Sequence, residues 1–189
     1  GGDLSISDLS FMGPGRFSVL NRGDQNDEVP GKGIFIDVRD DQQGLVSLAL
    51  DNVTVKGVAN HGIHVSDCSL ADACGSGSGG GGEGSPASIQ VRLNNVTVDD
   101  VGNGAFDADG LRIDERGEGS IDLQVNGSRF VRVGADGIEL DEGQAGNITA
   151  SLIDTALIDN GLYCHPGILT PYMPEIMERE FADGAANDI

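Results

Sequence analysis

Apolar and polar residues alternate in short segments along this chain, and the segments repeat. The clearest reads DGIELDE from Asp136, where Ile138 and Leu140 alternate with Glu139 and Asp141. A period of two residues predicts a strand with one buried face, because successive side chains of a strand point to opposite sides. Related segments begin at four other glycines: Gly33 (GIFIDV), Gly62 (GIHVSD), Gly110 (GLRIDE) and Gly167 (GIL).

A second alternating segment lies between these glycine-led strands and is divided by a polar corner. In IQVRLNNVTV, for example, Val91 and Leu93 precede a corner at Asn95, and Val98 follows it. Asn and Asp side chains bond to nearby main chain and tolerate a left-handed backbone, which Gly adopts freely. The pattern predicts such a corner in every repeat, at Asp8, Asn52, Asn95, Gly127 and Asp154.

Each repeat therefore predicts three short strands. The glycine-led strands recur after 27 to 30 residues, except between Gly62 and Gly110, where the spacing is 48. A period of this length is typical of a solenoid, in which successive turns stack on one another. The longer interval contains a glycine- and serine-rich stretch, which predicts a flexible insert at 69–88. The pattern stops after Thr170, so 171–189 are expected to form a weakly amphipathic capping segment that covers the open end, with a loose tail beyond Phe181.

Three short strands per turn, an asparagine-bearing corner and the phrases NVTV and DGIEL resemble the right-handed parallel β-helix proteins of the pectate-lyase-like superfamily. The resemblance covers about Leu4 to Thr170. It implies an all-β, single-stranded, right-handed parallel β-helix of about five turns at 1–170. That group includes polysaccharide lyases, glycoside hydrolases, epimerases, phage tailspikes and adhesins without catalytic activity. The chain does not reproduce the calcium-binding acids and catalytic Arg of the lyases, or the paired Asp and Gly-His-Gly turn of the hydrolases. A shared fold alone does not define a function.

The charge of the chain excludes one class of partner. With 31 acidic residues against 11 Lys and Arg, the formal net charge is −20. Such a chain is not a nucleic-acid binder that works by neutralising phosphates, and it needs a mediating cation to bind a polyanion. No apolar run is long enough to insert into a membrane. The chain starts at Gly1 without Met, and we expect it to be a processed or trimmed piece of a longer precursor.

Cysteine usage bears on the compartment. Cys68 and Cys74 lie at the glycine-rich insert, and Cys164 stands apart. A disulfide between the first two would close the insert and indicate an oxidising compartment, so that the protein would be secreted or periplasmic. The alternative is three reduced thiols in a cytosolic protein.

Stacked turns would bring acidic residues into columns, with equivalent residues roughly 4.8 Å apart. The sequence predicts three such columns: Asp109 over Asp136, Asp114 over Asp141, and Glu115 over Glu142. Like charges at that spacing repel by about 1 kcal/mol in water and by more in a protein. A cation, a raised pKa or exposure to solvent relieves the repulsion. Because every ligand offered is an oxygen, calcium is the expected cofactor, with the second and third columns as its ligands. The alternative is a solvated acidic face.

The glycine-led strands also bring histidine, arginine and carboxylates together. Such groups can supply a general acid or base, a stabiliser of charge and an anchor for substrate. The candidate catalytic residues are His61, His64, Asp109, Arg112, Asp136 and Glu139. The alternative is a ladder of ion pairs in which Arg112 pairs with Glu139 and with Asp109 or Asp114. Loops beside this column carry aromatic and basic residues suited to stacking on and binding sugars, and the candidate substrate-binding residues are Arg16, Phe17, Phe106 and Tyr163.

Two functions follow from these groups. The first is a secreted carbohydrate-active protein that acts on or binds a polysaccharide or cell-surface glycan, as a lyase, hydrolase or epimerase. In that function His61 or His64 would be the acid or base and Arg112 would stabilise charge. The carboxylates of Asp109, Asp136 and Glu139 would be acid, base or calcium ligands. The second function is a surface or adhesive β-helix scaffold without catalytic activity, whose acid columns bind calcium.

Overall fold

The computed structural model shows an all-β chain. It describes residues 1–13, 31–39, 41–67, 84–102, 108–143 and 145–161, together with the backbone of 176–182 and 185–188. All secondary structure in these ranges is strand. The described residues accordingly contain no helix that could cross a bilayer.

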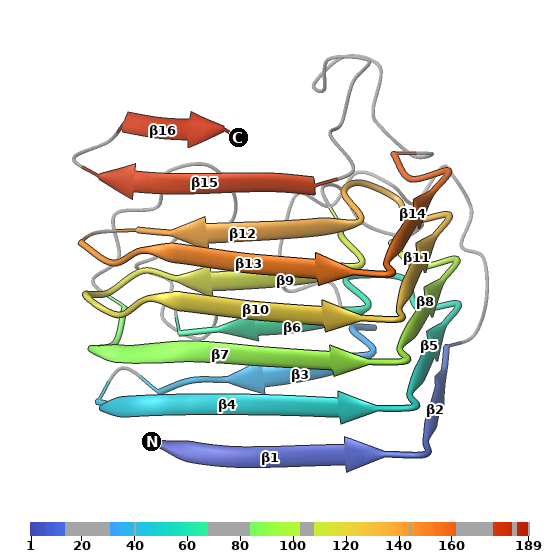
Figure 1. Ribbon diagram of the computed structural model, residues 1–189, viewed down its shortest axis with the longest axis horizontal. Coiled ribbons are helices and arrows are strands. Elements are labelled where there is room, and N and C mark those ends of the chain that lie inside the picture. The colour runs from blue at the N-terminus through green and yellow to red at the C-terminus, as the bar shows by residue number, and fades with distance from the viewer. Residues whose placement is uncertain are drawn as a thin grey trace.

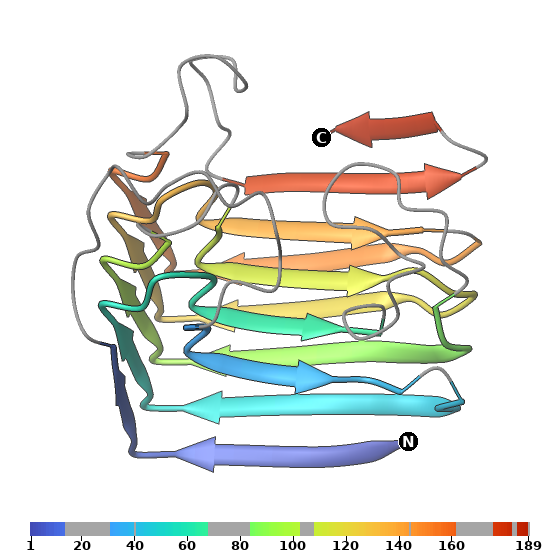
Figure 2. The same cartoon turned by 180° about the vertical axis from the view of Figure 1, so that it is seen from behind.

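Three sheets are built from strands that recur in the same order along the chain (Figure 1). Sheet A consists of β1 (Gly2–Ser7), β4 (Gly44–Asp51), β7 (Ala87–Asn94), β10 (Ile121–Asn126) and β13 (Ile148–Ile153). Sheet B consists of β2 (Ser10–Met12), β5 (Thr54–Lys56), β8 (Thr97–Asp99), β11 (Arg129–Val131) and β14 (Ala156–Ile158). Sheet C, seen from its own side in Figure 2, consists of β3 (Ile34–Asp37), β6 (Ile63–Ser66), β9 (Leu111–Glu115), β12 (Ile138–Glu142), β15 (Ile176–Ala182) and β16 (Ala185–Asp188).

Neighbouring strands within each sheet come from successive passes of the chain and run parallel, β16 excepted. In sheet C, Leu111 pairs with Ile138 and Arg112 pairs with Glu139, which confirms that the segments led by Gly110 and Gly137 lie in register. The same register stacks Asp114 on Asp141, as predicted, and extends that column to Ser66 and Asp37. The arrangement is consistent with a β-helix solenoid.

The core is formed by the alternate residues of all three sheets. Val91, Val98, Phe130, Leu111 and Ile138 are fully buried, and each belongs to one continuous apolar cluster. Burying a side chain of this size is worth about 1.5–3 kcal/mol, so the stacked aliphatic columns supply the main stabilisation.

The corner between sheets A and B adopts the predicted left-handed backbone. Asp8, Asn52, Asn95, Gly127 and Asp154 all have φ between 50 and 59°. The Asn95 amide donates to Asn52 Oδ1 at 3.0 Å, and the Asn52 amide donates to Asp8 Oδ1 at 2.6 Å. The corner side chains therefore bond between turns as well as tolerating the backbone.

A second left-handed column, which the sequence pattern did not indicate, follows sheet B. Gly57, Asp100, Arg132 and Asp159 have φ between 52 and 66°. These residues are of three types, Gly, Asp and Arg, whereas the first column is almost entirely Asn and Asp. Their common conformation comes from the stacking of equivalent turns, because Gly57, Asp100 and Arg132 each donate a backbone N–H to the next turn.

The glycines that lead β3, β6 and β9 of sheet C are required by a close approach between turns. A Cβ built on Gly33, Gly62 or Gly110 would lie 2.5–2.7 Å from the carbonyl oxygen of the equivalent glycine in the next turn. Real side chains do not tolerate such a contact with backbone. Glycine therefore recurs at this corner because successive turns pass too close together to accommodate a Cβ.

The C-terminal part of sheet C differs from the expectation. We predicted its fifth strand at Gly167, but β15 takes that place, with Ile176 paired to Ile138. The parallel ladder continues beyond Thr170, and β16 pairs antiparallel with β15 where a loose tail was expected. The segment GIL has only three residues, which is too short for an alternating pattern to define a register. The backbone N–H and C=O groups of β12 can pair with a strand of any sequence.

The insert also ends sooner than its composition suggests. It was predicted at 69–88, but β7 begins at Ala87, and Ala87 and Ser88 pair with Gly44 and Leu45. Small residues inside a strand look like a continuation of the insert in the sequence. The predicted disulfide between Cys68 and Cys74 and the thiol of Cys164 lie outside the described residues.

The corner column allows a test of the stacking. Gly127 has φ 59°, and a Cβ there would meet nothing within 4 Å. We expect Gly127→Asn to raise the free energy of unfolding by about 0.4–1 kcal/mol in urea denaturation, because Asn accepts this backbone and restricts the unfolded chain. Gly110→Ala is the matched contrast and should destabilise, because its Cβ would lie 2.5 Å from Gly137 O. Stabilisation by both substitutions would contradict the close approach of the turns.

Candidate carboxylate site on sheet C

Sheet C separates the predicted acid columns onto two faces. In β9, Leu111 and Ile113 belong to the core, so Glu115 points inward with them, while Arg112 and Asp114 point outward. In β12 the same alternation sends Glu142 inward and Asp141 outward. The four predicted metal ligands therefore do not share one face.

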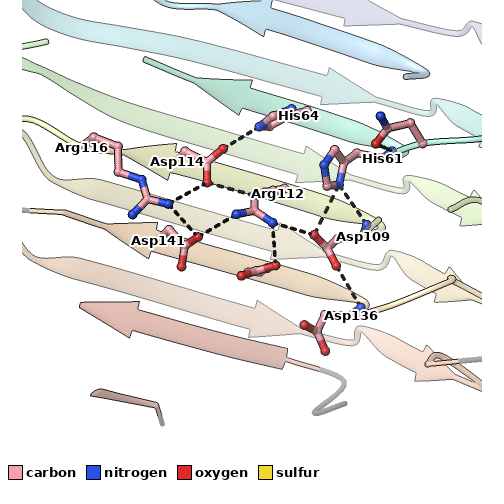
Figure 3. A network of polar contacts seen from close by, with 10 residues as sticks. His61, His64, Asp109, Arg112, Asp114, Arg116, Asp136 and Asp141 are labelled. Carbon is pink, nitrogen blue, oxygen red and sulfur yellow. Dashed lines mark hydrogen bonds and ion pairs between the residues drawn. The ribbon is translucent and has the colours of Figure 1, made fainter. Parts of the chain in front are cut away.

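The outward face of sheet C carries a buried cluster, which we call the outward polar group (Figure 3). Although these side chains point away from the core, each residue is at most 7% exposed. The group consists of His61, His64, Asp109, Arg112, Asp114, Arg116, Asp136, Glu139 and Asp141.

Arg112 is the centre of this group. Its Nε donates to Asp114 Oδ1 at 2.9 Å, and its Nη2 donates to Asp141 Oδ2 at 3.0 Å. Its Nη1 donates to Glu139 Oε2 at 3.1 Å and lies 3.6 Å from Asp109 Oδ2. The predicted ion-pair ladder is thus confirmed and extends to Asp141. A planar guanidinium can hold several carboxylates in this way, which a single ammonium cannot do.

The charges of this ladder reinforce one another. Burial opposes the charge of Arg112, but Asp114, Glu139, Asp141 and Asp109 raise its pKa well above the usual value. Burial likewise opposes the charge of Asp114, but Arg112, His64 and Arg116 hold its pKa well below the usual value. Both groups are therefore ionised at neutral pH. Arg116 adds a second guanidinium, 3.3 Å from Asp141 Oδ2.

The two histidines are neutral members of the group. Burial, with the charges of His64, Arg112 and Lys32, lowers the pKa of His61 well below its usual value. The Asp109 backbone N–H donates to His61 Nδ1 at 2.9 Å, so this nitrogen carries no proton and Nε2 does. Burial also lowers the pKa of His64, against the effect of Asp114. His64 Nε2 lies 2.6 Å from Asp114 Oδ2 and is therefore the donor in that bond.

Three carboxylates of the outward polar group meet at one point. Asp109, Asp136 and Glu139 each place an oxygen within 4.8 Å of the other two. Asp109 and Asp136 immediately precede the glycines that lead β9 and β12, and Glu139 lies on β12. The Asp136 backbone N–H donates to Asp109 Oδ1 at 3.0 Å, which ties the two turns together. This trio can hold a metal ion or share a proton.

The group as a whole is rich in negative charge. Within its described residues, five carboxylates face two guanidiniums and two neutral histidines. Buried charge is costly unless it is compensated. A protein relieves such an excess either with a cation or by retaining protons on some of the acids.

The structure gathers all six predicted catalytic residues. Asp109 contacts His61, Arg112 and the backbone of Asp136. Arg112 contacts Glu139, and His64 joins the group through Asp114. Arg116 belongs to the group but was not among the predicted residues. The signal was available, because the two-residue alternation that sends Arg112 and Asp114 outward continues to Arg116 just after the strand. All predicted substrate-binding residues lie outside the described residues, namely Arg16, Phe17, Phe106 and Tyr163.

No protein-family model, curated protein or solved structure matches this chain. Its function therefore has to be inferred from the geometry of the outward polar group itself.

Removal of the central guanidinium should reveal how much the ladder depends on it. We expect Arg112→Met to lower the free energy of unfolding by about 3–5 kcal/mol in urea denaturation, because the buried carboxylates then lose their common partner. The loss should shrink from roughly pH 7 to pH 5, because protonation of those carboxylates removes the repulsion. Arg129→Met, on the exposed face of β11, is the control and should change stability by less than about 0.5 kcal/mol. A loss of less than about 1 kcal/mol for Arg112→Met would contradict this role.

Proposed function

We propose that the chain is a right-handed parallel β-helix of about five turns. The support is the recurrence of one strand per sheet in each pass of the chain, always parallel to the strand before it. Connections between parallel strands of one sheet are right-handed in nearly all proteins, which supports the proposed hand.

We further propose that this β-helix binds a hard divalent cation of the calcium class at Asp109, Asp136 and Glu139. The observation that carries the proposal is the convergence of three buried carboxylates, whose oxygens lie within 4.8 Å of one another. Three buried acids at this separation repel strongly unless positive charge is added. Arg112 supplies part of that charge from one side, at Glu139 and Asp109.

The chemistry of the trio suits calcium. Calcium takes oxygen ligands at about 2.3–2.6 Å, so oxygens on opposite sides of the ion lie up to about 5 Å apart. The separation within the trio falls inside that limit. Calcium also accepts irregular geometry and fills the remainder of its 6–8 positions with other oxygens. The trio was predicted as acid, base or calcium ligands. It replaces the two acid columns that were also predicted to bind calcium, because Asp114 and Asp141 bind the two guanidiniums and Glu115 and Glu142 point inward.

A cation at the trio would join two turns of the proposed helix. Asp109 belongs to the turn that leads into β9, and Asp136 and Glu139 belong to the next turn. The protein would then be a scaffold whose stacking calcium reinforces. Extracellular modules bind calcium with dissociation constants of about 10⁻⁴–10⁻³ M, which fits the proposed secreted or periplasmic location.

Calcium should stabilise the protein in a way that depends on the trio. At a calcium concentration about 10 to 100 times the dissociation constant, we expect a gain of about 1.4–2.7 kcal/mol, measured as a rise in Tm and by isothermal titration calorimetry. Asp136→Asn should weaken binding by at least about tenfold, because a neutral amide replaces a ligand charge. Asp41→Asn, at an exposed acid outside the site, should respond as the parent protein does. An equal response of both variants would sink the proposal.

A second candidate function is action on a glycan, and a specific observation favours it. Asp109 lies beside neutral His61, at 3.3 Å, and beside Arg112, at 3.6 Å, and its backbone partner is Asp136. Two carboxylates so close to each other do not both ionise easily, so one can act as an acid and the other as a base. Glycosidic bonds are cleaved by carboxyl pairs of this kind. We place this function second because Asp109 and Asp136 are fully buried, whereas a polysaccharide must reach them.

The glycan function predicts product release from a panel of neutral and acidic polysaccharides, measured as new reducing ends or as unsaturated sugars. If the function holds, Asp109→Asn should reduce the rate by at least about 100-fold, because general acid–base catalysis contributes that much. Asp41→Asn should leave the rate unchanged. The absence of product from every polysaccharide, together with calcium-dependent melting, would leave the scaffold as the function.

A further inference from the structure

Acidic side chains also stack inside the coil, at the end of sheet C. Glu115 and Glu142 pair in register and point inward with the core residues of β9 and β12. Asp67 follows Ser66, which pairs with Asp114, so Asp67 continues the same column one turn earlier. We call Asp67, Glu115 and Glu142 the inner carboxyl column. All three are at most 1% exposed.

The inner carboxyl column fastens the turns that lead from sheet C to sheet A. Glu115 Oε1 accepts hydrogen bonds from Gly117 N at 3.0 Å and Gly119 N at 3.2 Å. Glu142 Oε1 accepts one from Gly146 N at 2.9 Å. Asp67 accepts from Ser85 N at 2.7 Å and from Arg116 N at 2.9 Å. Each carboxyl group therefore accepts hydrogen bonds from backbone N–H groups that would otherwise have no partner in a buried, irregular turn.

The second oxygen of Glu115 is in an unusual position. Glu115 Oε2 is buried and has no hydrogen-bond partner among the described residues. Glu115 lies in the column between two other acidic residues, Asp67 of the preceding turn and Glu142 of the next turn. An ionised Glu115 would bury an unpaired negative oxygen between like charges, which is strongly unfavourable.

No described positive charge approaches this oxygen. The next residue, Arg116, directs its guanidinium outward to Asp114 and Asp141. The segments of sheet A that follow these turns, 85–88, 119–121 and 145–148, contain no charged residue. A proton on Glu115 is therefore the simplest compensation available at this point in the described structure.

We propose that Glu115 is a neutral carboxylic acid at neutral pH, and that the loss of its proton in mild alkali loosens the turn at 115–119. The hydrogen bonds between the inner carboxyl column and the turns from sheet C to sheet A would then depend on pH. This inference is independent of the cation site and of action on a glycan.

The direction of titration agrees with this geometry. Burial and the charge of Asp67 raise the pKa of Glu115 from 4.5 to about 8, with Glu142 adding to the rise and the amides of Gly117 and Gly119 opposing it. Burial also raises the pKa of Asp67. Because the folded state keeps a proton that the unfolded chain releases near pH 4.5, stability should fall as the pH rises from about 4.5 to about 8 and then level off.

The same turn carries a residue of the outward polar group. Arg116 donates its backbone N–H to Asp67, and its side chain reaches Asp141 on the opposite side of the sheet. Loosening of the turn would therefore free the backbone that positions Arg116. The two charged clusters, one inside and one outside sheet C, meet at this residue.

Glu115→Gln tests the proposal, because glutamine has nearly the same shape and stays neutral at every pH. Between roughly pH 6 and pH 8, the unfolding constant of the parent protein should rise by up to about tenfold per pH unit more than that of Glu115→Gln in urea denaturation. Glu118→Gln, at an exposed acid of the same turn, is the matched control and should follow the parent protein. After correction for the intrinsic rise of the exchange rate with pH, amide hydrogen exchange at Gly117 and Gly119 should accelerate above about pH 8 in the parent protein but not in Glu115→Gln.

A direct measurement keeps the test independent of whether the variant folds. The side-chain carboxyl ¹³C resonance of Glu115 in the parent protein should titrate near pH 8. A midpoint near the ordinary value of 4.5 would overturn the proposal, as would identical pH dependence of stability in Glu115→Gln and the parent protein.

Discussion

The structure depends on the parallel register between successive turns of the chain. Backbone hydrogen bonds set that register, and they bring residues 27 to 48 positions apart to the same level, as in the pairing of Arg112 with Glu139 and of His64 with Arg112. Every other feature follows from this stacking. Aliphatic residues form columns in the core, corner residues form hydrogen-bonded columns, and acids are forced into columns of like charge.

The chain relieves those acid columns differently on the two sides of sheet C. Outside, Arg112 and Arg116 hold Asp114 and Asp141, and we propose a cation for the trio of carboxylates beyond Arg112. Inside, backbone N–H groups bind one oxygen of each acid, and we propose a proton for Glu115. The difference follows from the alternation of the strands, which places Arg112 and Arg116 on the outward face and apolar core residues beside Glu115 and Glu142 on the inward face.

The close approach of the turns explains why the site lies where it does. The glycine before each sheet C strand lets one turn pass within contact of the next, and a Cβ there would collide with a carbonyl oxygen. Asp109 and Asp136 immediately precede two of these glycines, and the backbone of one donates to the side chain of the other. The same constraint that repeats glycine therefore brings these carboxylates together, in the connections just before β9 and β12.

The sequence by itself determined the strands, their order and their register, because a two-residue period and repeated Gly and Asn corners are local signals. These local signals predict that Leu111 stacks on Ile138 and that Asn52 stacks on Asn95. Only the tertiary structure decided what is buried and which groups meet. The local pattern could not show that Asp114 binds His64, that Asp141 joins the ion pairs of Arg112, or that Ile176 takes the place expected for Gly167. Burial and charge compensation depend on neighbours from other turns, and their side chains are placed by three-dimensional packing that no local period records.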